Sequence, residues 1–143
     1  MNAPLKDGFV ADASLALAWA VESQSSEETE GLLEDVAAGA PFFVPVLWAC
    51  EVANGLLILK RRKKIGPEHY TRARRALNNL NPAVDEDGAR LALGTISDLA
   101  NDHGLTVYDA IYLELAVRKR LPLASLDAAL NRAARLSSVK TLL

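Results

Sequence analysis

Short apolar runs alternate with longer, amphipathic stretches along the chain. Runs of three or four residues predict strands, and stretches whose apolar residues recur every three or four positions predict helices. The expected strands cover 8–11, 42–44, 82–84, 121–124 and 139–142. The expected helices cover 14–22, 27–38, 45–60, 67–80, 86–101, 106–120 and 127–136. This alternation predicts an α/β fold, in which a mostly parallel central sheet of four to five short strands carries helices on both faces.

The chain contains no internal repeat, low-complexity tract or long linker, so we expect a single domain over 1–143. One segment, 42–59, resembles a membrane span because it has 18 residues and few polar ones. Pro45 divides it into a strand and a helix, however, and Glu51 near a bilayer centre would cost about 3 kcal/mol. The N-terminus also lacks the apolar stretch of a secretory signal. We therefore expect a cytoplasmic protein that does not cross a membrane.

Composition narrows the possible functions. A chain of 143 residues with 50% hydrophobic content can bury a substantial core. The single cysteine, Cys50, rules out an internal disulfide and provides no zinc-ligand set, in keeping with a reducing compartment. The formal net charge of −2 and the pI near 5.7 argue against a protein that binds nucleic acid through bulk charge alone.

Four acidic residues stand out because they lie inside or beside apolar segments. Asp12, Asp109 and Asp127 follow short apolar runs at the point where a helical pattern begins. Because ligands of parallel sheets bind outside the carboxyl ends of the strands, we expect these acids to meet at one edge. Glu51 lies within the expected helix 45–60 and shares a face with Asn54, three residues later.

Each of the three aspartates has a simpler interpretation as a residue that caps a helix or complements its dipole. Glu51 has no such role. It lies in the most apolar part of the chain, where burial without a partner raises the pKa of a carboxyl group or costs several kcal/mol. Taken together, the four acids favour a site that holds a cation.

The charge distribution supports a phosphodiester substrate. Without the four acids, the net charge of −2 becomes +2. A basic run over 60–64 is followed by Arg72, Arg74 and Arg75, and this run is interpreted either as a soluble helix end or as an RNA contact. An acidic centre with basic flanks suits a phosphodiester that is bound through a metal ion.

Three blocks of the sequence resemble the PIN-domain nucleases and, within them, the VapC-like toxins of type II toxin-antitoxin pairs. The blocks are FVADASLALAW, VPVLWACEVANGL and LTVYDAIYLELAVRKRLPLASLD. The D-x-S start, the E-x-x-N helix and the Y-D-A-x-Y-L-x-L-A block are specific in combination, although each alone is weak. The resemblance implies a PIN-like three-layer α/β/α nuclease that binds Mg²⁺, or alternatively Mn²⁺, cuts RNA and is silenced by a small antitoxin.

The resemblance also assigns roles to individual residues. The catalytic set that it implies consists of Asp12, Glu51, Asp109 and Asp127. Asp12 and Asp109 are expected to be the most direct metal ligands, with Glu51 and Asp127 completing the site. Residues expected to orient carboxylates or waters are Ser14, Asn54 and Ser125, the last standing where many relatives have threonine.

The resemblance also implies binding partners, and other functions remain as alternatives. We expect an RNA substrate, a cognate antitoxin and a homodimer, with some of the apolar residues near Trp48 available for a dimer surface or an antitoxin helix. A PIN nuclease of RNA processing that is not a toxin remains an alternative, as does a non-catalytic binding module whose acids only cap helices. A phosphatase would need a second aspartate two residues after the first, where this chain has Ser14.

Overall fold

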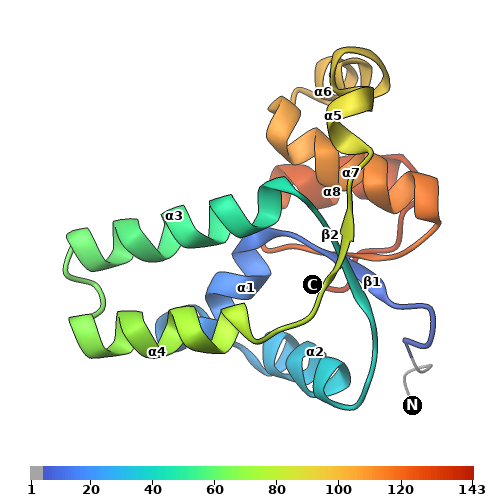
Figure 1. Ribbon diagram of the computed structural model, residues 1–143. Coiled ribbons are helices and arrows are strands. Elements are labelled where there is room, and N and C mark those ends of the chain that lie inside the picture. Colours follow the sequence, from blue (N-terminus) through green and yellow to red (C-terminus); the bar gives the residue numbers. More distant parts are fainter. Residues whose placement is uncertain (1–4) are drawn as a thin grey trace.

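The computed structural model describes residues 5–143, and a parallel sheet lies at the centre of the molecule (Figure 1). Its strands are β1 (Phe9–Ala11), β2 (Phe42–Pro45), β3 (Ala83–Asp85) and β4 (Leu123–Ala124), in the spatial order β3-β2-β1-β4. All three strand pairings are parallel. The strands therefore bring their carboxyl ends to the same edge of the sheet.

Alternating side chains of β2 face opposite layers of helices. Phe42 pairs in register with Phe9, and their rings stack 6.2 Å apart on the face that also receives Trp19 and Trp48. Phe43 points the other way, where its ring lies 5.4 Å from the Lys119 ammonium group. Both faces of the sheet are thus covered, as expected for a parallel sheet.

One layer consists of helices from the first half of the chain. These are α1 (Ala13–Ala20), α2 (Glu27–Ala37), α3 (Leu47–Arg61) and α4 (Pro67–Asn78), with a short 3₁₀ turn at Glu22–Gln24. Ser26 caps α2 through a capping box with Thr29, and Pro67 opens α4 at a position that needs no amide donor. The helices α3 and α4 form a long antiparallel hairpin that projects from the sheet (Figure 1).

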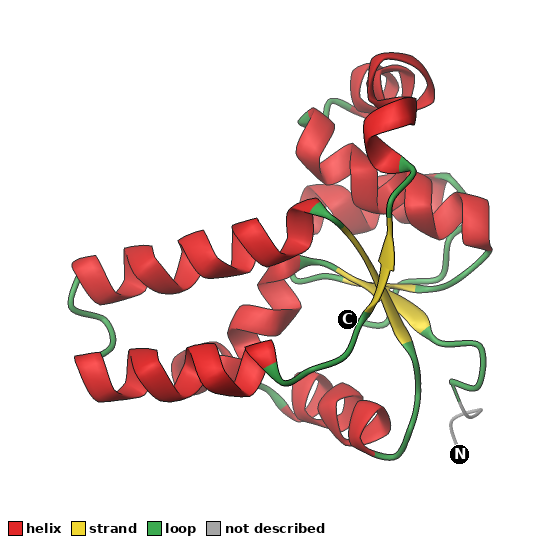
Figure 2. Ribbon diagram, in the orientation of Figure 1, coloured by secondary structure: helices red, strands yellow, loops and turns green. Residues whose placement is uncertain are grey.

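The other layer comes from the second half of the chain. It contains α5 (Gly88–Leu91), a π-helical segment (Ala92–Ile96), α6 (Ser97–His103), α7 (Val107–Lys119) and α8 (Ala128–Leu136). Figure 2 shows these helices gathered on one side of the strands. The central helix of this layer, α7, packs against β1, β2 and β4, and most of its residues from Ala110 to Ala116 are buried.

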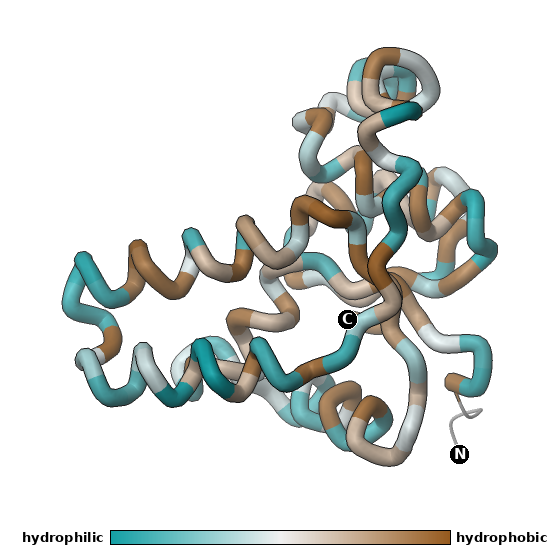
Figure 3. Tube along the Cα trace, in the orientation of Figure 1, coloured by the Kyte–Doolittle hydropathy of each residue, from teal (hydrophilic) through white to brown (hydrophobic). Residues whose placement is uncertain are grey.

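The distribution of apolar residues matches the position of the sheet at the centre of the molecule. Figure 3 shows apolar positions concentrated along the strands, whereas α4 is mostly hydrophilic. Residues 42–59 form β2 and most of α3. Within residues 5–143, no helix is long and apolar enough to cross a membrane.

The predicted fold class is confirmed: the sheet is parallel and lies between helical layers. Two predicted elements are wrong in detail. The helix expected over 86–101 is broken, because Gly94 adopts a non-helical conformation (φ −121°, ψ −110°) that a residue without a side chain tolerates. The strand expected over 139–142 is reduced to one bridge between Leu123 and Thr141, because its neighbour β4 is only two residues long.

Candidate active site

Asp12 lies directly after β1 and is the most buried of the four candidate acids, with 6% of its surface exposed. Its Oδ1 accepts a hydrogen bond from Ser14 Oγ at 2.5 Å and from the Leu15 amide at 3.2 Å, so it caps α1. Its Oδ2 accepts from Ser125 Oγ at 2.5 Å. Burial raises the pKa of Asp12, and these hydrogen bonds oppose that effect only in part.

The segment after β4 is tied to the same place. The Ser125 hydroxyl accepts a hydrogen bond from the Asp127 amide at 2.9 Å, and Ser14 Oγ accepts one from the Leu126 amide at 2.9 Å. Asp127 Oδ1 in turn accepts from the Leu130 amide at 2.8 Å and caps α8. Asp12 and Asp127 therefore do cap helices, as predicted. The two helices they cap, α1 and α8, begin next to each other.

Glu51 reaches the site from the second turn of α3. Its Oε1 accepts a hydrogen bond of 2.5 Å from the Tyr112 hydroxyl on α7. Burial raises the pKa of Glu51, the Tyr112 hydrogen bond lowers it, and the nearby charges of Asp109 and Asp12 raise it further. Glu51 is therefore a half-buried acid without a capping role, as the sequence predicted.

Asp109 occupies the first turn of α7 and is the electrostatic centre of the group. Burial raises its pKa, and the charge of Asp127 raises it further. The charge of Asp109 in turn contributes to the raised pKa values of Asp12 and Glu51. The helix is capped by Thr106, whose hydroxyl accepts from the Asp109 amide at 3.1 Å, so Asp109 itself is not the cap.

Basic groups do not neutralise this cluster. The salt bridges in the described part of the chain involve only Arg90 and Arg118, and neither contacts the four acids. The basic run at the end of α3 begins at Lys60, nine residues after Glu51, which places it about 14 Å further along the helix. Burial is the main cause of the raised pKa values of Asp12, Glu51 and Asp109, and the like charges held together near them raise these values further.

The donor set fits a hard divalent cation by its chemistry, since carboxylate and hydroxyl oxygens are the ligands such ions prefer. As the side chains stand, no three acidic, histidine or cysteine groups among residues 5–143 converge closely enough to hold one ion. Two of the acids, Asp12 and Glu51, are directed toward hydroxyl donors instead. The arrangement is suited to an ion held by one or two carboxylates together with water, which is the usual situation for Mg²⁺.

The structure brings together most, but not all, of the predicted residues. Ser14 and Ser125 contact Asp12 directly. Asn54, expected to share the cleft with Glu51, is exposed and makes none of the side-chain hydrogen bonds found in residues 5–143. Tyr112 was not singled out from the sequence, although its spacing of three residues from Asp109 placed it on the same face of a predicted helix.

A second group of acids surrounds one arginine at the other end of α7. The Arg118 guanidinium donates two hydrogen bonds to Asp85, at 2.7 and 2.9 Å, and binds Glu114 at 2.8 Å. Asp87 lies 3.4 Å from the same group. The Arg118 hydrogen bonds hold the pKa of Asp85 below its usual value. These residues are called the Arg118 cluster below.

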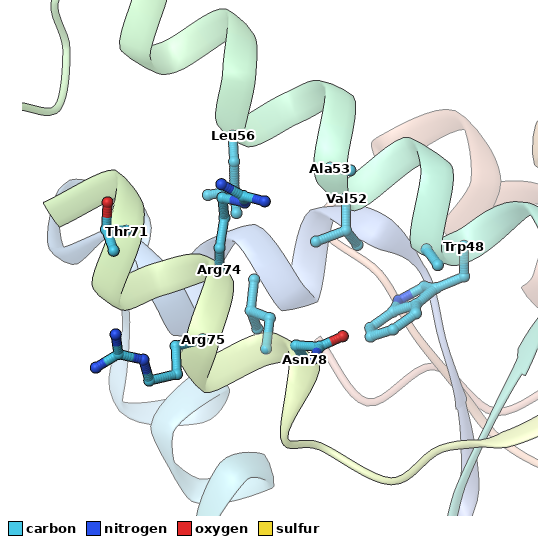
Figure 4. Close-up of a pocket in the computed structure, with 10 residues that line it drawn as sticks. Trp48, Val52, Ala53, Leu56, Thr71, Arg74, Arg75 and Asn78 are labelled. Carbon is cyan, nitrogen blue, oxygen red and sulfur yellow. The ribbon is translucent and has the colours of Figure 1, made fainter. Parts of the chain in front are cut away.

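A groove of about 480 Å³ lies between α3 and α4, away from the four acids (Figure 4). Its apolar wall includes Val52 and Leu56, and Arg74 and Arg75 lie along α4. The ring nitrogen of Trp48 is buried at one end and has no hydrogen-bond partner among the described residues. The groove is thus apolar with a basic border.

The fold and the acids together define a three-layer α/β/α protein with a carboxylate site at the carboxyl edge of its sheet. Residues 9–136 match the family model of the PIN domain, and the chain belongs to that family. No curated protein matches the chain.

Solved structures share this fold. A chain of a toxin-antitoxin complex from Klebsiella pneumoniae aligns with a TM-score of 0.60 and 21% identity, over 95% of this chain and 98% of its own. A chain of FitAcB from Neisseria gonorrhoeae aligns with a TM-score of 0.63 and 15% identity, over 93% of this chain and 95% of its own. At these identities the likeness concerns the fold.

Proposed function

We propose that this protein is a metal-dependent endoribonuclease and the toxin of a type II toxin-antitoxin pair. PIN domains are generally nucleases, which supports a hydrolase that acts on nucleic acid. The observation that carries the proposal is the group of four acids that share one edge of the sheet and have no salt-bridge partner among residues 5–143. Asp12 and Asp109 are the proposed ligands of Mg²⁺ or Mn²⁺, and Glu51 and Asp127 complete the site.

The protein's own residues hold this site in place. Ser14 and Ser125 each engage one oxygen of Asp12, which fixes the orientation of its carboxylate between α1 and β4. Asp109 projects from the first turn of α7, where the helix dipole favours a negative charge. When bound, a divalent ion supplies a Lewis acid that lowers the pKa of a water molecule and stabilises charge on a phosphate.

Cleavage of a labelled RNA by the purified chain tests this activity. We expect cleavage with Mg²⁺ or Mn²⁺ that is abolished by EDTA. Asp12→Asn and Asp109→Asn should lower the rate by about 100- to 1000-fold, as is typical when a group that stabilises transition-state charge is removed. Asp98→Asn, which alters an exposed acid on α6, is the matched control. Normal cleavage by either site variant would contradict the assignment.

The toxin role has separate support. One of the solved structures with this fold is a toxin-antitoxin complex. We propose that the groove between α3 and α4 receives a segment of the cognate antitoxin that carries apolar side chains and acidic residues. The apolar wall and the border of Arg74 and Arg75 suit such a segment. A homodimer is also proposed, and light scattering will test it.

Growth assays test the toxin role. Expression of the chain should arrest growth, expression of Asp12→Asn should not, and the product of an adjacent small gene should restore growth. Ala53→Glu places a negative charge in the groove and should prevent this rescue, whereas Ala89→Glu, at an exposed position of α5, should not. A chain that cuts RNA without arresting growth would instead be an RNA-processing nuclease.

A further inference from the structure

Resting on the proposed function, we propose that Tyr112 is a positioning residue that holds Glu51 inside the acidic site and thereby sets the affinity of that site for a divalent cation.

The position of the Tyr112 hydroxyl is fixed by its ring. Tyr112 is 1% exposed as a residue and belongs to the hydrophobic core. Its hydroxyl donates to Glu51 Oε1 at 2.5 Å, a bond between two residues separated by 61 positions in sequence. A buried side chain in a close-packed core has little freedom to move, so its hydroxyl is a rigid anchor.

Glu51 needs such an anchor because its neighbours repel it. The charges of Asp109 and Asp12 both act on Glu51, and its side chain is only half buried. A free glutamate has several rotatable bonds and would turn toward solvent, where like charges are screened. The Tyr112 hydrogen bond opposes this movement.

The spacing along α7 makes the anchor specific to the site. Tyr112 follows Asp109 by three residues, so one face of α7 presents an acid and also holds the acid that arrives from α3. The hydrogen bond also lowers the pKa of Glu51 against the effect of burial, which favours the charged form that a cation binds. The helix α7 therefore positions two of the four carboxylates: it carries Asp109, and it holds Glu51 through Tyr112.

Titration of Mn²⁺ into the metal-free full-length chain, followed by calorimetry, tests the proposal without any measurement of cleavage. Tyr112→Phe keeps the buried ring and removes only the hydroxyl. We expect its Kd for Mn²⁺ to rise by about tenfold or more, the range typical for residues that orient metal ligands. Tyr108→Phe removes a hydroxyl from an adjacent turn position that is 61% exposed, and its Kd should stay that of the wild type.

A double-mutant cycle separates positioning from a general structural role. If Tyr112 acts through Glu51, then Tyr112→Phe should have no further effect on Mn²⁺ affinity in a Glu51→Gln background. An equal loss in both backgrounds would overturn the proposal, as would wild-type affinity in Tyr112→Phe. Glu51→Asp leaves the core untouched and is one methylene too short to reach the hydroxyl, so a similar loss is expected there even if Tyr112→Phe folds poorly.

The Mn²⁺ titration distinguishes an absent metal site from a metal site that does not depend on Tyr112. If the wild-type chain itself binds no Mn²⁺, the proposed function is wrong and the role of Tyr112 falls with it. If the wild type binds Mn²⁺ and Tyr112→Phe binds it equally well, only the role of Tyr112 is wrong.

Discussion

The two ends of α7 carry two clusters of acids that differ in one respect. At its first turn, Asp109 joins acids that form no salt bridge within residues 5–143, and burial raises the pKa values of Asp12, Glu51 and Asp109. At its last turn, Arg118 binds Asp85 and Glu114, and the pKa of Asp85 is lowered. The same residue type is therefore stabilised as an anion at one end of the helix and destabilised at the other.

This difference shows which cluster is complete. In the Arg118 cluster the cation is Arg118 itself. Its bidentate hydrogen bonds to Asp85 link α7 to β3. The four-acid cluster contains hydroxyl donors and helix termini, and no lysine or arginine in the part of the chain that the structure describes forms a salt bridge with it. A stable protein tolerates such a group only where another benefit offsets its cost, which makes it the better candidate for a functional site.

Removal of the cation from the complete cluster should have the largest effect on stability. Arg118→Met leaves Asp85 and Glu114, whose side chains are both 6% exposed, without their partner. We expect the free energy of unfolding in urea to fall by about 3 kcal/mol, as is found when one member of a buried ion pair is removed. Arg90→Met is the control: its pair with Asp87 is exposed, and its loss should cost less than about 1 kcal/mol.

Addition of a cation to the other cluster should have the next largest effect. At a Mn²⁺ concentration near 100 times its Kd, binding to the folded state alone stabilises the chain by about 2.7 kcal/mol. Thermal unfolding with and without Mn²⁺ measures this gain. Asp109→Asn should lose it, while Asp85→Asn should keep it. A melting temperature that is the same with and without Mn²⁺ would favour a non-catalytic binding module.

The same substitution should have opposite consequences in the two clusters. In the absence of metal, Asp85→Asn should destabilise the chain by about 1.5 to 3 kcal/mol, because hydrogen bonds to a charged group are lost. Asp109→Asn should leave the metal-free chain as stable as the wild type or more so, because a repelling charge is removed. Urea midpoints of the two variants give the comparison, and equal losses would show that the clusters do not differ.

The pH dependence of stability should be the smallest effect and should also differ in sign. A carboxyl group with a raised folded-state pKa binds its proton preferentially in the folded chain, so Asp12, Glu51 and Asp109 add stability as pH falls toward about 4. Asp85 contributes fully above its ordinary pKa, and its contribution is lost as pH falls through its lowered folded-state value.

Metal-free stability should therefore rise from neutral to mildly acidic pH and then decline. Urea unfolding at a series of pH values measures the curve. Asp109→Asn should reduce the rise in stability between neutral and mildly acidic pH, and saturating Mn²⁺ should do the same. A wild-type curve that falls steadily from neutral pH would contradict the predicted sign.

Much of the site was predictable because it depends on local rules. Short apolar runs placed Asp12 and Asp127 at the ends of parallel strands, and helical periodicity placed Asp109 in a first turn. The contact between Tyr112 and Glu51 was not predictable, since it joins two helices whose packing depends on the whole core. The Arg118 cluster was missed for the same reason, because Asp85 and Arg118 lie 33 positions apart.

The pairing of β1 with β4 has a consequence for how the protein is made. Asp12 is synthesised more than 100 residues before Ser125, which donates a hydrogen bond to its carboxylate, and Asp127 also comes after β4. A nascent chain on the ribosome therefore carries three of the four acids before the last strand exists, and a product that terminates before β4 lacks the pieces that orient Asp12. The carboxylate site therefore assembles only after β4 has been synthesised.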